Sequence, residues 1–254
     1  MIIFGLREKF VKKILVLITI LLTLASLAIA AEIAFPAFSS LKPGQTLPSS
    51  LRFIAIPKVK HNTVALVDDQ SVTVLKVDSS NSAGSVALPF SVDAATTPML
   101  TWRWKVSRIL DKADMEEKST DDFSARVYVF FDVPLASLSF AERTKIRLAR
   151  LVAGVDVPTA ALCYVWDNKH PIGFAHASPY TKSVQKFVLQ SGPEKVGQWI
   201  TETRDVAADF RLAFGFEPPR ITGVAIGNDT DNTAEQVTAW FGDVHFGNKK
   251  QGAK

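Results

Sequence analysis

Near its carboxyl end the chain carries the stretch Ile221-Thr-Gly-Val-Ala-Ile-Gly-Asn-Asp-Thr-Asp-Asn-Thr-Ala-Glu-Gln-Val-Thr-Ala-Trp-Phe-Gly-Asp-Val-His-Phe246. Both ends of the stretch are rich in apolar and β-branched residues, whereas acidic, amide and hydroxyl residues gather at 228–233. Two β-prone runs on either side of a polar cluster are typical of two strands and the connection between them. We therefore predict core strands at 221–226 and 238–246.

The same succession of β-prone runs and turn signals continues upstream. It predicts strands at 72–77, 86–92, 99–106, 125–133, 162–166, 182–190 and 199–206. In the run 99–106, Leu100, Trp102, Trp104 and Val106 share one face, because side chains alternate along a strand. Many short strands without βαβ alternation predict an all-β fold, a jelly-roll-like antiparallel β-sandwich.

The sandwich is predicted to be a single domain over residues 51–247. A lead-in segment at 31–50 precedes it, and a disordered tail at 248–254 follows it. The run 107–121 is charged and poor in apolar residues, which predicts a long exposed connection.

One or two short helices are expected to complete the fold. Ser139 and Glu142 form a capping-box pattern that opens a helix at 139–152, with Phe140 on its buried stripe and basic residues on the opposite face. That basic face is either a solvated cover of the sheet or a surface for an anionic partner. A second short helix or turn is predicted at 207–214.

The amino-terminal segment has the order of a secretory signal. Basic residues at 7–13 precede an uncharged apolar run at 14–30 that ends in Ala28-Ile-Ala30. We predict a signal peptide at residues 1–30 and hence a periplasmic or secreted bacterial protein. The run is at the short limit for a membrane span, so membrane attachment through an uncleaved signal is the alternative. The segment carries +3 of the formal charge of +4, so the rest of the chain gives no reason to expect nucleic acid binding.

Asp121, Asp122 and Arg126 form the first candidate site, at the start of the strand predicted from 125. Extended geometry places Asp122 and Arg126 on one face, where the guanidinium could fork onto a carboxylate or hydroxyl pair of a ligand. The alternative is a structural ion pair that fixes the preceding connection.

Asp229, Asp231 and Asn232 form the second candidate site, between the last two predicted strands. Their oxygens at alternate positions could bind Ca²⁺, although the spacing lacks the glycine and the glutamate of an EF-hand loop. The alternative is that these side chains cap the backbone of their own turn.

Two aromatic pairs recur at alternate positions, Trp102 with Trp104 and Tyr164 with Trp166. On an exposed sheet face such pairs could stack on sugar rings, whereas inside a sandwich they would fill the core. Trp166 is the best candidate for ligand contact because it precedes the polar pair Asp167-Asn168.

Sequence motifs for catalysis are absent. The chain contains no Gly-x-Ser-x-Gly, no His-Glu-x-x-His, no phosphate-binding loop and no Cys/His metal spacing. Cys163 lies in an apolar run that predicts a buried, inert thiol. Paired carboxylates for glycoside chemistry would have to come from Asp122 together with Asp229 or Asp231.

Several short motifs match one known family in the same order along residues 50–246. The chain resembles the bacterial family catalogued as domain of unknown function 3047, which has exported members and no established activity. More weakly, the last strands resemble those of jelly-roll carbohydrate-binding and galactose-binding-like modules. The matching motifs are Trp102-Arg-Trp104, Asp121-Asp122 with Arg126, Tyr164-Val-Trp166, Ser191-Gly192 with Gly197 and Trp199, Asp209, Phe214-Gly215, Asp229-Thr-Asp-Asn-Thr233 and Phe241-Gly-Asp243.

These observations lead to one expected function and two alternatives. We expect an exported, non-catalytic binding protein for a glycan or another small polar ligand, with no resident cofactor except a candidate Ca²⁺ ion. The alternatives are a carbohydrate-active hydrolase or lyase, and an envelope structural or interaction protein that uses the basic helix. The expected ligand contacts are Asp121, Asp122, Arg126, Trp166, Asp229, Asp231 and Asn232.

Overall fold

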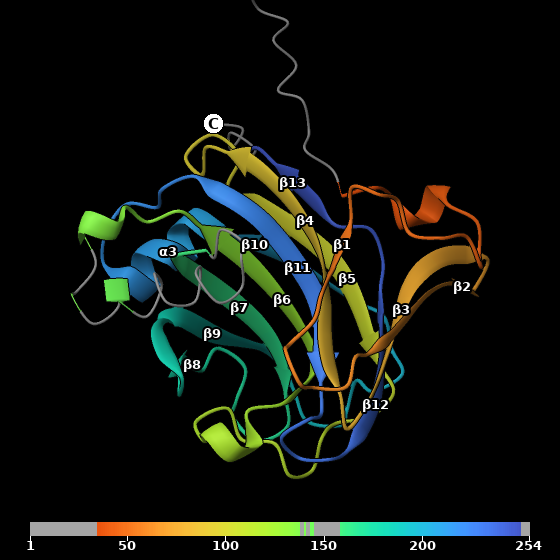
Figure 1. Cartoon of the computed structure of the whole chain (residues 1–254). Helices are drawn as coiled ribbons and strands as arrows, with labels where there is room; N and C mark the ends of the chain where they lie inside the picture. Colours follow the sequence, from red (N-terminus) through yellow and green to blue (C-terminus); the bar gives the residue numbers. More distant parts are fainter. Residues whose placement is uncertain (1–34, 138–139, 141–142, 145–157, 250–254) are drawn as a thin grey trace, which may run out of the picture. The chain divides into compact units, whose positions relative to one another are not determined.

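The computed structural model describes residues 35–137, 140, 143–144 and 158–249 (Figure 1). They form two β-sheets that pack face to face, so the predicted jelly-roll-like β-sandwich is confirmed. The predicted signal segment, residues 250–254 and most of the predicted basic helix lie outside the described residues. Among the residues described, no helix combines the length and apolar character needed to span a membrane.

Seven strands form the first sheet, and five strands plus a short sixth form the second. All neighbours are antiparallel except β7 and β9, which run parallel. The first sheet has the order β1 (Arg52–Ile54), β4 (Ala83–Val92), β11 (Ile221–Asp229), β6 (Phe123–Phe131), β7 (Ala160–Asp167), β9 (Thr181–Ser191) and β8 (Ala175–Ser178). The second has the order β10 (Ile200–Asp205), β5 (Met99–Val106), β12 (Gln236–Phe241), β3 (Val72–Ser80) and β2 (Thr63–Asp69), and β13 (His245–Gly247) also pairs with β5.

The two sheets are joined by a core of alternating side chains. On β5 the polar residues are half-buried, whereas Leu100, Trp102, Trp104 and Val106 are buried, as the alternation predicts. The ring centroids of Trp102 and Tyr164 are 5.4 Å apart across the sandwich, so the aromatic pairs pack on one another. The core interpretation of these pairs is therefore correct.

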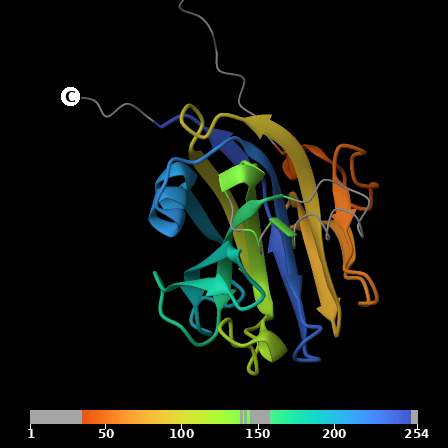
Figure 2. The same ribbon diagram turned by 60° about the vertical axis from the view of Figure 1, so that its left-hand side comes forward.

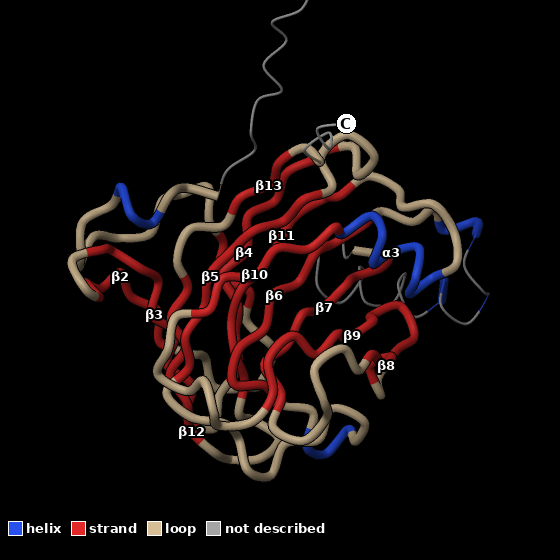
Figure 3. Tube along the Cα trace, turned by 180° about the vertical axis from the view of Figure 1, so that it is seen from behind, coloured by secondary structure: helices blue, strands red, loops and turns tan. Residues whose placement is uncertain are grey.

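The predicted strand 238–246 is broken into β12 and β13 (Figure 3). Gly242 donates its N–H to the carbonyl of Arg103 at 3.0 Å, and a Cβ at this position would collide with the Arg103 side chain. The backbone leaves the sheet here, and Val244 turns into the core with 1% exposure. Close approach to Arg103 therefore interrupts what the sequence pattern predicts as one strand.

The amino-terminal part of the described chain packs into the same core. Phe35 and Phe38 are 2% and 0% exposed, and Phe38 begins the short helix η1 (Phe38–Ser40). Farther along, Thr73 of β3 donates its hydroxyl to the carbonyl of Leu41. Two further single-turn helices are η2 (Lys118–Thr120) and η3 (Leu135–Ser137).

The predicted short helix at 207–214 is α3 (Val206–Phe214), which lies at one side of the strands in Figure 2. Asp205 caps it by accepting the N–H of Ala208, and Gly215 ends it at φ 78°, a conformation that glycine adopts readily. In the other predicted helix, Phe140 was expected on a buried stripe. Its side chain is 78% exposed, so it faces solvent and adds nothing to the core.

Candidate functional site

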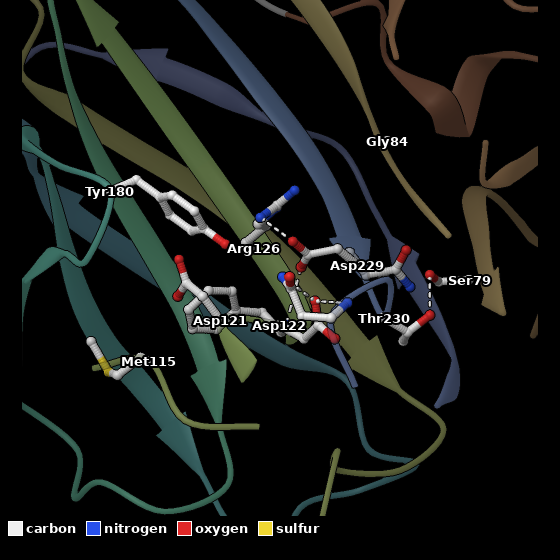
Figure 4. A network of polar contacts seen from close by, with 12 residues as sticks. Ser79, Gly84, Met115, Asp121, Asp122, Arg126, Tyr180, Asp229 and Thr230 are labelled. Atoms are coloured by element: carbon white, nitrogen blue, oxygen red, sulfur yellow. Dashed lines mark hydrogen bonds and ion pairs between the residues drawn. The ribbon is translucent and has the colours of Figure 1, made fainter. Parts of the chain in front are cut away.

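Six of the seven residues expected to contact a ligand meet at one end of the seven-stranded sheet (Figure 4). Asp121 and Asp122 precede β6, Arg126 lies within it, and Asp229 ends the neighbouring strand β11. Asp231 and Asn232 belong to the connection that follows β11. We call these six residues the polar end of the sheet.

Arg126 and Asp229 form the centre of the polar end. Arg126 Nη1 is 2.5 Å from Asp229 Oδ2, and both side chains are almost fully buried. The other oxygen of Asp229 accepts the N–H of Phe123 at 3.0 Å. Extended geometry put Asp122 and Arg126 on one strand face, where they could meet, but Arg126 pairs with Asp229 instead. A register shift between Gly227 and Asp229 brings Asp229 opposite the start of β6, so Asp229 takes the guanidinium.

Asp122 has a different role, because both of its oxygens accept hydrogen bonds from the β11–β12 connection. Oδ2 accepts the N–H and the hydroxyl of Thr233, each at 2.7 Å. Oδ1 accepts the N–H and the amide of Asn232 at 3.3 and 3.2 Å. The carboxylate is 1% exposed. The turn is thus capped by a residue more than a hundred positions away, rather than by its own side chains as the structural alternative supposed.

Asp121 joins the polar end to the far side of the same sheet. Its Oδ1 accepts a hydrogen bond of 2.7 Å from Lys186 of β9, whose side chain is 2% exposed. Lys186 also donates to the carbonyl of Met115. Tyr180, which is half-exposed, donates its hydroxyl to the carbonyl of Lys118 and lies beside Arg126 and Asp121 in Figure 4.

The carboxylates of the polar end influence one another electrostatically. Burial raises the pKa of Asp121, and it raises the pKa of Asp229 to about 8, with neighbouring carboxylates adding to the effect. Burial and Asp122 raise the pKa of Asp231 in the same way. Burial alone would lower the pKa of Arg126, but the nearby Asp229 carboxylate raises it.

Three of these carboxylates could share a cation. One oxygen each of Asp122, Asp229 and Asp231 lies within 4.8 Å of the other two. The oxygens of Asp122 and Asp229 already accept hydrogen bonds or face Arg126, whereas Asp231 Oδ1 is buried and has no hydrogen-bond partner among the described residues. The geometry therefore favours a structural role, in which these carboxylates hold the β5–β6 and β11–β12 connections together. The Ca²⁺ site stays a prediction.

Trp166 is the one expected contact that the structure places elsewhere. It is 1% exposed and packs in the sandwich core, with its ring centroid 6.0 Å from that of Trp104. Its indole nitrogen donates to the carbonyl of Gly192 at 3.3 Å. The following residue, Asp167, still belongs to β7, so the polar turn begins too late to bring Trp166 to the surface. A buried indole cannot stack on a ligand, and this expectation is corrected.

A second candidate surface lies on the outer face of the six-stranded sheet, and the sequence reasoning missed it. Trp240 of β12 and Trp199, just before β10, are both half-buried. The ammonium of Lys105 lies 4.7 Å from the ring centroid of Trp240 and 5.1 Å from that of Trp199. The guanidinium of Arg103 lies 4.5 Å from the centroid of Trp199. We call these four residues the tryptophan face.

The two cations of the tryptophan face differ in their ion pairing. Lys105 forms an ion pair with Asp69, whose carboxylate also accepts the indole N–H of Trp199 at 3.1 Å. Within the described chain, Arg103 has no carboxylate partner. Alternation along 99–106 already put Arg103 and Lys105 on the solvent face. What the sequence could not show is that Trp240 pairs with Lys105 across the strands.

Comparison with known proteins identifies the family. The model of the family described as protein of unknown function (DUF3047) matches residues 51–245. No curated protein matches the sequence. Among solved structures, the family 30 carbohydrate-binding module of a Clostridium thermocellum cellulosomal cellulase is 12% identical, with a TM-score of 0.36 and coverage of 87% of this chain and 99% of that one.

Two solved enzyme structures also match. The xyloglucanase domain of NopAA from Sinorhizobium fredii, in complex with cellobiose, is 10% identical, with a TM-score of 0.42 and coverage of 86% and 98%. Endoglucanase 3 of family GH12 from Trichoderma harzianum is 9% identical, with a TM-score of 0.39 and coverage of 80% and 100%. At these levels the likeness concerns the fold, and function has to be argued from the residues.

Proposed function

We propose that this chain, which belongs to the family DUF3047, is an exported, non-catalytic binding protein that holds an acidic glycan on its tryptophan face. Export rests on the signal-like order of residues 1–30, in which basic residues precede an apolar run and a small-residue cleavage pattern. The binding function rests on side chains of β5 and β12 and on Trp199, just before β10.

One observation supports the binding proposal most strongly: two half-buried indoles flank a lysine on an outer sheet face, beside Arg103, which has no carboxylate partner among the described residues. Indole rings can pack against the apolar faces of pyranose rings, and the indole N–H adds a polar contact. Arg103 can fork onto a carboxylate, and a sulfate presents similar oxygens. Together these groups suit a sugar that carries an acidic substituent.

Binding to defined glycans tests the proposal. Residues 31–254 would be titrated calorimetrically with neutral and with uronate- or sulfate-bearing oligosaccharides chosen from a glycan array. We expect binding of an acidic glycan, weakened about tenfold by Trp199→Ala or Trp240→Ala through lost ring contact. Arg103→Gln should weaken binding of the acidic glycan while leaving binding of its neutral analogue unchanged.

Tyr180→Ala is the matched control, because Tyr180 is an exposed aromatic residue beside the polar end. If no glycan binds, the proposal fails. If binding survives both tryptophan substitutions and is lost in Tyr180→Ala, the site lies at the polar end and the tryptophan face is structural.

A second candidate function, glycoside hydrolysis, has one specific observation in its favour. Asp122, Asp229 and Asp231 converge, and the pKa values of Asp229 and Asp231 are raised, as a general acid requires. Release of reducing ends from the same glycans, abolished in Asp231→Asn, would support it. Bound glycan that stays intact over long incubation would remove it.

A further inference from the structure

Metal-ligating side chains also gather away from the polar end and the tryptophan face. Asp114 and Glu116 come from the connection between β5 and β6, and His170 lies in the turn after β7. One ligand atom of each lies within 4.8 Å of the other two. His170 Nε2 is 3.2 Å from Glu116 Oε2 and 4.0 Å from Asp114 Oδ1. His170 is 9% exposed, so this imidazole is held within the structure rather than projecting into solvent.

Hydrogen bonding decides which nitrogen of His170 faces these carboxylates. Asp167 Oδ2 lies 2.9 Å from His170 Nδ1 and also accepts the backbone N–H groups of Lys169 and His170. An ionised carboxylate only accepts, so Nδ1 carries a proton that it donates to Asp167, and Nε2 is the nitrogen available to a metal ion. Nε2 and two carboxylate oxygens then point at one another. Asp114 Oδ1 also accepts the backbone N–H of Glu116 at 3.1 Å, and a cation at this position would use the remaining lone pairs of the three ligand atoms.

We propose that a divalent transition-metal ion of the Zn²⁺ class occupies this position, held by His170 Nε2, Asp114 Oδ1 and Glu116 Oε2. Mixed imidazole and carboxylate donors favour such ions over Ca²⁺ and Mg²⁺, which take oxygen ligands. In a tetrahedral site with bonds of about 2.0–2.2 Å, ligand atoms stand about 3.3 Å apart. Glu116 already has this spacing to His170, and Asp114 needs only a small approach.

The surroundings match what a metal-bound histidine needs. Asp167 fixes the tautomer and the ring orientation of His170, as carboxylates behind metal-bound histidines do. Lys169 pairs with the other oxygen of Asp114, which leaves Oδ1 directed towards His170.

His176 lies behind the proposed ligand Glu116 and can orient its carboxylate through the oxygen that does not face His170. Its Nε2 is 3.5 Å from Glu116 Oε1. The ring of Phe174 stacks between the two imidazoles, with centroid distances of 4.5 Å to His170 and 6.2 Å to His176 and nearly parallel planes. The side chains of Glu116 and His176 are 44% and 43% exposed, so an ion can enter from solvent.

The ion would act as a clamp between segments distant in sequence. Glu116 and His170 are 54 positions apart, and a metal that joins them closes the intervening loop. Because the site is absent from the unfolded chain, binding stabilises the folded state.

Metal titration of residues 31–254 tests this proposal. After chelation and dialysis, the protein would be titrated calorimetrically with Zn²⁺, Mn²⁺ and Ca²⁺, and its thermal midpoint measured with each. We expect one Zn²⁺ per chain, bound about a hundredfold more tightly than Ca²⁺, and a midpoint that rises with Zn²⁺ concentration.

Variants locate the site. Glu116→Gln and His176→Gln change exposed side chains, so both should fold, and each should weaken Zn²⁺ binding about tenfold or more. Glu217→Gln and His61→Gln are matched controls, since both residues are exposed and lie outside the cluster. Asp231→Asn tests the other acidic cluster and should leave Zn²⁺ affinity unchanged. Absence of Zn²⁺ and Mn²⁺ binding, or Zn²⁺ binding that both Glu116→Gln and His176→Gln leave intact, would overturn the proposal.

Discussion

Replacement of Asp122 by alanine should cost about 2–6 kcal/mol of unfolding free energy. The carboxylate accepts four hydrogen bonds, and removing it leaves four donors in the β11–β12 connection. Asn232 is half-buried, so water can reach its two donors after truncation. Thr233 is 6% exposed, and its N–H and hydroxyl would be left without a partner. Each unsatisfied buried donor costs about 1–3 kcal/mol, which gives the stated loss.

Urea unfolding at neutral pH measures this loss as a lower midpoint with an unchanged slope. Asp122→Asn keeps the shape and one acceptor oxygen, so it should cost about half as much. Asp111→Ala is the control, because its carboxylate is 71% exposed and pairs only at the surface, where the loss should stay below about 1 kcal/mol. An Asp122→Ala protein that loses less than about 1 kcal/mol would show that the loop does not depend on this carboxylate.

Three further outcomes concern the polar end. Arg126→Met should cost about 3–5 kcal/mol in urea unfolding at pH 9, where Asp229 is ionised and would be left buried without a counter-charge. Adding Asp229→Asn should recover part of that loss, and additive losses would contradict the pairing. Because burial raises the pKa of Asp229 to about 8, the folded chain holds this proton more tightly than the unfolded chain does. Stability should therefore fall as the pH rises from about 5 to 8, with a smaller slope in Asp229→Asn; equal slopes would show that Asp229 does not titrate there. The hypothesis of a Ca²⁺ site predicts a thermal midpoint that millimolar Ca²⁺ raises in the wild type and not in Asp231→Asn, and an equal rise in both would place Ca²⁺ elsewhere.

The strands could be predicted because their information is local. The run Met99–Val106 has strict alternation, and both its bounds and its buried face agree with the structure. The connection between the strands predicted at 72–77 and 86–92 is shorter than expected, since β3 continues to Ser80 and β4 starts at Ala83. Polar residues enter these strands because distant partners satisfy them, as when Ser79 Oγ lies 2.8 Å from Thr230 Oγ1 (Figure 4). Such partners cannot be read from a local pattern.

The sequence predicted which residues gather at the polar end of the sheet, but not which of them pair with one another. Asp121, Asp122, Arg126 and the cluster at 229–232 do meet, because strand ends that carry polar residues collect at one edge of a sandwich. Which carboxylate takes Arg126 depends on a register shift in β11, which no periodicity reveals.

Exposure of an aromatic residue depends on which faces of its strand are covered, which explains why the sequence pointed to the wrong tryptophan. Trp166 shares its face with Leu162 and Tyr164, but both faces of β7 are buried, since Cys163 and Val165 on the other face are also 0% exposed. Trp240 stands between the buried residues Ala239 and Phe241, so its ring points outward. Alternation along 238–246 would have assigned Trp240 to the solvent face, had the core side of that strand been known.

The connection between β5 and β6 relates the polar end to the proposed metal site. Its composition predicts a long exposed segment, yet Leu110, Ala113 and Met115 are 1%, 5% and 0% exposed. Lys186 holds the carbonyl of Met115 and the carboxylate of Asp121 together. Side chains of this connection therefore cap a turn at one end and face His170 at the other. A charged segment becomes ordered here because its charges have partners, and a metal ion beside His170 would be one more of them.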